Sequence, residues 1–176
     1  MPAAHLRLPA KRIDISGSSP QLLAIYLNDH LAGATVGVEL ARRLRASNQS
    51  DDRFGPPLAK ICAEIEADRV TLERVMEMLG IRRSRIKPAG AWIAEKLGRL
   101  KPNGRLCGYS PLSRLVELEF LCIGIAGKTQ MWNALEHTLG SSVGEFDFGQ
   151  LAERASAQRA RARELHLAAA AAAFPS

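Results

Sequence analysis

Two Ser-Pro pairs, at 19–20 and 110–111, each precede a long run in which apolar side chains recur every three or four residues. A hydroxyl side chain can cap the first free N–H groups of a helix, and proline is tolerated at the first helical position because its missing N–H would have no partner there. Apolar spacing of three and four residues places side chains on one helix face. The pattern predicts helices over about 20–45 and 111–139, each with an apolar face to bury.

Three further segments carry helical signals. A polar loop with two prolines separates the first helix from a second, which is predicted over about 58–79 and is ended by Gly80. A shorter helix is expected over about 89–100, and Asp147 with Gln150 forms a capping box that opens a last helix. The chain therefore reads as a succession of helices joined by polar turns.

The composition favours packing of helices against helices. Hydrophobic residues make up 47% of the chain but aromatic residues only 5%, a mixture poor in the residues that sheets prefer. Four long helices and a short crossover helix predict an all-α four-helix bundle. In this organisation 1–18 is a flexible N-terminal segment, 19–168 is the bundle domain, and 169–176 is an alanine-rich tail that extends the last helix, docks on a neighbour or frays.

The formal net charge of +6 raises the question of an anionic partner. A short basic cluster comprises Arg82, Arg83, Arg85 and Lys87, but no aromatic side chains are interleaved on which bases could stack. A solvated surface is the preferred interpretation. Nucleic acid is a disfavoured partner, kept as a hypothesis that predicts binding with a steep dependence on salt.

The cysteines are odd in number and widely spaced, at Cys62, Cys107 and Cys122. This pattern matches neither a disulfide framework nor a zinc knuckle, so a reducing cytoplasm is expected. The first twelve residues contain no uninterrupted apolar core and predict no secretion signal. No stretch is long enough to span a bilayer, so membrane insertion is not expected.

Polar side chains interrupt the apolar faces of the long helices, most of them near mid-helix. They are His30, Asp68, Glu119 and Gln158. A buried polar group without a partner is costly, so each of these needs a partner or a function. In an antiparallel bundle the four positions could come to one level, and the sequence therefore predicts a cluster in which Glu119 points inward while Glu117 lies on another face.

Two chemistries suit such a cluster. A metal site at His30, Asp68 and Glu119 would bind iron, manganese or zinc and activate oxygen or water. Simple hydrogen bonding would instead satisfy the buried groups without any turnover. For Asp68 the alternatives are a salt bridge, to Arg69 or to another helix, and a functional carboxylate.

Small residues and a helix end give two more expectations. Gly33 and Gly37 lie one turn apart on the first helix, and Gly124 and Gly127 lie midway along the helix over 111–139. Backbones can approach closely where side chains are missing, so a tight helix crossing is expected there. His137 lies near a helix end and is expected to be exposed, in a favourable position relative to the helix dipole.

The two long helix pairs, the central crossover and the mid-helix carboxylates resemble the ferritin-like superfamily over roughly Pro20 to His166. The di-iron members of that superfamily carry a Glu and then Glu-x-x-His, and repeat both in the second helix pair. This chain departs from that motif throughout. Glu64 and Glu66, for example, are followed three positions later by alanine and arginine. The resemblance implies the architecture rather than a di-iron oxidase or iron store.

Three functional hypotheses follow. The leading one is a non-catalytic ferritin-like bundle that acts through protein interaction or small-ligand binding, with a homo-oligomer expected. The second is an oxidase or hydrolase with a degenerate metal centre at His30, Asp68 and Glu119, and the third is nucleic-acid binding through the basic cluster. Whether the chain is an enzyme stays open, as does the identity of its ligand or partner.

Overall fold

A computed structural model describes residues 20–84 and 109–175 of the chain. The predicted N-terminal segment 1–18 and the predicted short helix over 89–100 lie outside the described residues, as do Arg85, Lys87 and Cys107. The described part is mostly helical, which confirms the all-α class.

The helices of the described part are α1 (Pro20–Ser47), α2 (Gly55–Met78), α4 (Pro111–Leu139) and α5 (Phe148–Ala173). A hairpin of two very short antiparallel strands, β1 (Ser142–Val143) and β2 (Phe146–Asp147), joins α4 to α5.

Local side-chain chemistry explains where the helices begin and end. The Ser110 hydroxyl accepts a hydrogen bond from the Ser113 N–H at 3.1 Å, and proline follows the cap as predicted. The Asp147 carboxylate accepts from the Gln150 N–H at 2.9 Å, and the Gln150 amide donates back to it at 3.3 Å. Gly140 ends α4 with a φ of 89°, a conformation that favours glycine. The N-caps predicted at Ser110 and Asp147 are therefore confirmed, and the one predicted at Ser19 lies outside the described residues.

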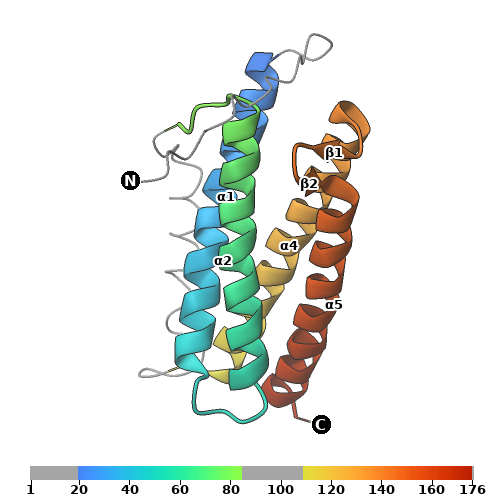
Figure 1. Cartoon of the computed structure of the whole chain (residues 1–176). Coiled ribbons are helices and arrows are strands. Elements are labelled where there is room, and N and C mark those ends of the chain that lie inside the picture. Colours follow the sequence, from blue (N-terminus) through green and yellow to red (C-terminus); the bar gives the residue numbers. More distant parts are fainter. Residues whose placement is uncertain (1–19, 85–108, 176) are drawn as a thin grey trace, which may run out of the picture.

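The helices form two pairs. Figure 1 shows α1 beside α2, and α4 beside α5, with the second pair inclined to the first. Neighbouring helices run in opposite directions within each pair, because α1 and α2 are joined by a short loop and α4 and α5 by the hairpin. The packing of α1 against α4 then brings the two pairs together.

The core consists of two apolar clusters, one toward each end of the molecule. The first joins the C-terminal half of α1, the N-terminal halves of α2 and α4, and the C-terminal half of α5; its centre includes Leu44, Leu58, Leu118 and Ala162. The second joins the opposite halves of the helices and the hairpin; its centre includes Leu27, Val75, Trp132 and Phe148. Polar side chains occupy the middle level, between the two clusters.

The alanine-rich end of the chain continues α5 through Ala173. Ala169 is fully buried in the first cluster, and Ala168, Ala170 and Ala173 pack against it. Alanine has the highest intrinsic helix propensity, and its small side chain fits where helices approach closely. Over residues 20–84 and 109–175, no helix is both long and apolar enough to cross a membrane.

Candidate functional site

Asp68 is the buried centre of an ion network that joins three helices. Its side chain, on α2, is 5% exposed. One carboxylate oxygen accepts from the Lys128 ammonium of α4, and the other accepts from the Arg154 guanidinium of α5. The salt bridges to other helices confirm one of the two roles expected for Asp68, whereas Arg69 pairs with Glu73.

Gln158 of α5 extends this network to a second carboxylate. Its amide oxygen accepts from the Lys128 ammonium at 2.6 Å, and its amide nitrogen donates to Glu64 at 3.1 Å. The same nitrogen lies 3.5 Å from an Asp68 oxygen. Glu64 in turn pairs with Arg161 of α5. The prediction that Asp68 and Gln158 meet is therefore confirmed.

The ion network carries an excess positive charge. Its three cations are Lys128, Arg154 and Arg161, and its two carboxylates are Glu64 and Asp68. Burial lowers the pKa of the Lys128 ammonium, and the adjacent Asp68 carboxylate opposes that shift. The contact with Asp68 therefore favours the charged form of Lys128, which burial disfavours.

Sequence reasoning missed the cations of this network, although the sequence contains signals for them. Lys128 is the only Lys or Arg between Leu115 and Leu139, in the most apolar helix of the chain. Glu64 and Asp68 lie four residues apart, and Arg154, Gln158 and Arg161 follow the same helical spacing, so each set shares a helix face. Complementary charged faces on two helices could have predicted the pairing.

A cleft of about 600 Å³ opens beside the ion network, between α1, α2 and α4, and is called the α1–α4 cleft below. Its apolar walls are formed by Val36, Leu40, Ile65, Leu72, Phe120, Leu121, Ile125 and Met131. His30, Asp68 and Lys128 also line it, together with Tyr26, Asp29 and Arg69. The cleft reaches the surface beside Ile123, whose side chain is 61% exposed. Both its size and its lining are typical of small-molecule sites.

Four glycines widen this cleft. Gly33 and Gly37 of α1 and Gly124 and Gly127 of α4 line it, and a Cβ added at any of them would meet no atom within 4 Å. The expectation of a tight helix crossing at these positions is therefore wrong. The missing side chains leave an open space between α1 and α4 instead of bringing the two backbones into contact.

Replacing the cleft glycines with alanine is expected to stabilise the fold. Gly33→Ala and Gly37→Ala should each raise the free energy of unfolding by roughly 0.5–1 kcal/mol, because alanine loses less backbone entropy in a helix. Gly55→Ala is the matched control and should destabilise, since its Cβ would lie 2.9 Å from the Asn48 carbonyl oxygen. Urea unfolding would measure all three. If Gly37→Ala lowered the free energy of unfolding as Gly55→Ala is expected to do, the space beside Gly37 would be filled and the cleft would be closed.

His30 is half-buried in the wall of the cleft. Its ring packs edge-on against Tyr26, with ring centroids 4.6 Å apart and an interplanar angle of 70°. Burial lowers the pKa of the imidazole, and the adjacent Asp29 carboxylate raises it in part. The folded protein thus favours the neutral ring.

This pKa shift predicts a dependence of stability on pH. Because the folded-state pKa of His30 lies below the ordinary 6.5, the unfolded chain binds the proton more readily. The contribution of His30 to stability is present above pH 6.5 and is lost as the pH falls through the lowered value. His30→Phe should therefore flatten the stability profile of the wild type below pH 6.5, as measured by urea unfolding at a series of pH values. Identical pH profiles of stability for the wild type and His30→Phe would contradict the lowered pKa of His30.

The prediction for Glu119 is wrong. Glu119 is exposed, whereas the Glu117 side chain is buried and contacts Arg43 at 2.6 Å and the Tyr109 hydroxyl, which donates to it at 3.0 Å. Burial raises the pKa of Glu117, and Arg43 opposes that shift. Apolar residues surround α4 on almost every side, so the sequence pattern did not define its inner face.

The predicted three-residue metal site does not form. Asp68 and His30 line the same cleft, but Glu119 lies on the surface. Within residues 20–84 and 109–175, no group of three or more His, Cys, Asp and Glu side chains could hold a metal ion. What the structure does bring together is Asp68, Gln158, Lys128 and Arg154.

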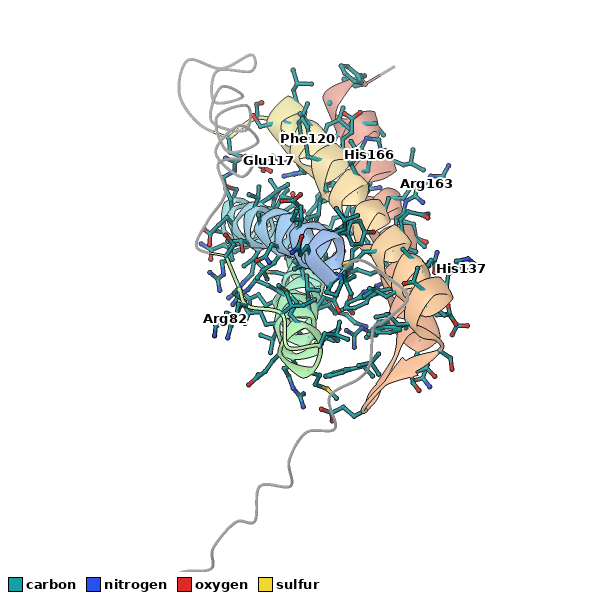
Figure 2. The ribbon with its side chains drawn as sticks, turned by 90° about the horizontal axis from the view of Figure 1, so that it is seen from above. Arg82, Glu117, Phe120, His137, Arg163 and His166 are labelled. Carbon is teal, nitrogen blue, oxygen red and sulfur yellow. The ribbon has the colours of Figure 1, made fainter. Side chains whose placement is uncertain are left out.

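The outer faces carry exposed basic groups. Figure 2 shows His137 and Arg163 on the side of the α4–α5 pair that faces away from α1 and α2, in agreement with the exposure predicted for His137. Arg82 and Arg83, the described part of the basic cluster, are exposed, and Arg83 pairs with Glu73 at 3.1 Å.

The described part of the chain is thus an all-α protein with an open apolar cleft, and the ion network centred on Asp68 lies beside that cleft. Comparisons of the chain with protein-family models, with curated proteins and with solved structures found no match.

Proposed function

We propose that this chain is a ferritin-like helical bundle that binds a small apolar molecule in the α1–α4 cleft without transforming it. The observation that carries the proposal is the cleft itself, a space of about 600 Å³ with apolar walls from three helices. Four glycines keep it open, although alanine at each position would fit and would favour the helix. A binding role explains why these positions lack side chains.

The polar groups beside the cleft support a binding role over catalysis. Both oxygens of Asp68 are occupied by cations, and Lys128 contacts Asp68 and Gln158. A general base or a nucleophile works best with its reacting atom turned toward the substrate, whereas these groups are held in contacts with one another. They are suited to recognising one polar group of a bound molecule.

Self-association in the cytoplasm belongs to the same proposal. Leu22 and Ile25, near the start of α1, are exposed apolar side chains that a second copy could cover. The odd number and wide spacing of the cysteines support a reducing compartment. Light scattering over a range of concentrations would test the association, and a strict monomer would contradict it.

Titration with Nile red, a neutral apolar dye, tests the cleft. The wild type should bind the dye, and Gly33→Leu and Gly124→Leu should each weaken binding by about tenfold or more, because their side chains would fill the space. Ala160→Leu, on the exposed face of α5, is the matched control and should bind like the wild type. Circular dichroism would verify that each variant is folded. Dye binding that the two glycine variants leave unchanged would contradict the proposal.

A further inference from the structure

We infer that the molecule bound in the α1–α4 cleft carries a carboxylate, which contacts the Lys128 ammonium while its apolar body lies along the cleft. This inference rests on the function proposed above and narrows it to one class of ligand, an amphiphilic monocarboxylic acid.

The first argument is the hydrogen-bonding capacity of Lys128. Its side chain is 17% exposed and lines the cleft. An ammonium has three N–H donors, and the contacts with Asp68 and Gln158 use two of them. The third donor can bind an acceptor within the cleft. A charge-assisted hydrogen bond of this kind is stronger than one between neutral groups.

The second argument is charge. The ion network has three cations and two carboxylates, which leaves one positive charge in excess, and Lys128 is the cation of the network that lines the apolar cleft. Of the other two charged residues that line the cleft, Arg69 is paired with Glu73, and Asp29 has an interaction of its own, so neither is a free charge. A single carboxylate would neutralise the excess charge of the network. A phosphate dianion would turn the excess positive charge into an excess negative one, and an alcohol would leave the positive charge uncompensated.

The third argument is the shape of the space next to Lys128. Along α4 the cleft is lined from Phe120 to Trp132, and the part from Phe120 to Lys128 has a rise of about 12 Å at 1.5 Å per residue. Gly124 and Gly127 lie within this stretch, so the channel stays open between the ammonium and Phe120. An alkyl chain of medium length, attached to a carboxylate at Lys128, would follow it.

Displacement of Nile red by decanoic acid and by decanol, at a pH where the acid is ionised, tests the inference. Wild-type protein should bind the acid about tenfold more tightly than the alcohol, or better. Lys128→Met should abolish this preference and keep the affinity for decanol, because methionine preserves the apolar length of the side chain. Arg161→Met removes the same charge from a side chain that is 38% exposed and lies outside the cleft lining, so it should reduce the preference much less than Lys128→Met does.

The outcomes separate this inference from the function on which it rests. If the wild type binds acid and alcohol equally, the inference is overturned while the proposed function stands. If the wild type binds neither Nile red nor decanol nor decanoic acid, the proposed function fails as well. Retention of the preference by folded Lys128→Met would also overturn the inference.

A second measurement avoids the substitution and covers the case in which Lys128→Met does not fold. Decanoic acid labelled with ¹³C at its carboxyl would be titrated by NMR while bound to the wild-type protein. Contact with the ammonium should hold the pKa of the bound carboxyl below that of the free acid. An equal or higher pKa would overturn the inference.

Discussion

Asp68→Ala should lower the free energy of unfolding by about 3–5 kcal/mol, the loss typical of removing one partner from a buried ion pair. The substitution leaves the Lys128 ammonium with Gln158 as its remaining contact within the network, in an apolar surrounding where a charge is poorly solvated. The lost contact with Arg154 contributes less to this destabilisation, because the Arg154 side chain is 48% exposed and water can replace the carboxylate. Urea unfolding followed by circular dichroism would measure the effect.

Two comparisons make this result specific. Glu145→Ala removes the partner of Arg74 in an exposed pair and should change stability by no more than about 0.5 kcal/mol. The double variant Asp68→Ala and Lys128→Met should recover much of the loss, because it removes both buried charges. A single Asp68→Ala variant as stable as the wild type would show that water already solvates Lys128.

Trp132→Ala should destabilise the fold by about 3–5 kcal/mol through the cavity that it leaves. The side chain is 1% exposed and stacks on Phe148, with ring centroids 6.0 Å apart and an interplanar angle of 17°. It joins α4 to α5 in the second core cluster and also lines the α1–α4 cleft. Scanning calorimetry would measure the loss together with the change in unfolding temperature.

Ile123→Ala, on the same helix, is the control for Trp132→Ala. The Ile123 side chain is 61% exposed, so its truncation should change the free energy of unfolding by no more than about 0.5 kcal/mol. A loss below about 1 kcal/mol for Trp132→Ala would place the indole outside the core and contradict the packing of α4 on α5.

The helices of the described part could be predicted because their signals are local. Caps, prolines and glycines act within one turn, and the predicted helices over 20–45 and 111–139 match α1 and α4 to within two residues. The predicted start of α2, near Leu58, is three residues late. Pro56 and Pro57 look like loop residues in the sequence, but they lie in the first turn of α2, where a missing N–H loses no helical bond.

The hairpin between α4 and α5 escaped prediction because it is too short to show a pattern. Two strands of two residues each give no alternation to detect. Val143 and Phe146 nevertheless bury their side chains in the second core cluster. Their burial depends on the helix ends that surround them, which the local sequence does not encode.

The candidate site could be predicted in part. The inward position of Asp68 followed from its place in the apolar face of α2, and the structure confirms it. Its cationic partners, Lys128 and Arg154, are 60 and 86 residues away in sequence, so finding them required the relative height of three helices. The cleft was missed because glycines in a helix are compatible both with close packing and with open space, and only the distances between helices distinguish the two.

The division of the core has a consequence for the motions of the protein. Each apolar cluster holds one half of every described helix, and the charged middle layer separates the clusters. The units that open together should therefore be the two ends of the molecule rather than individual helices. The cleft is lined by Leu40 and Ile65 from one cluster and by Leu72 and Met131 from the other. A molecule bound there would touch both ends, so its binding should slow hydrogen exchange in both halves at once.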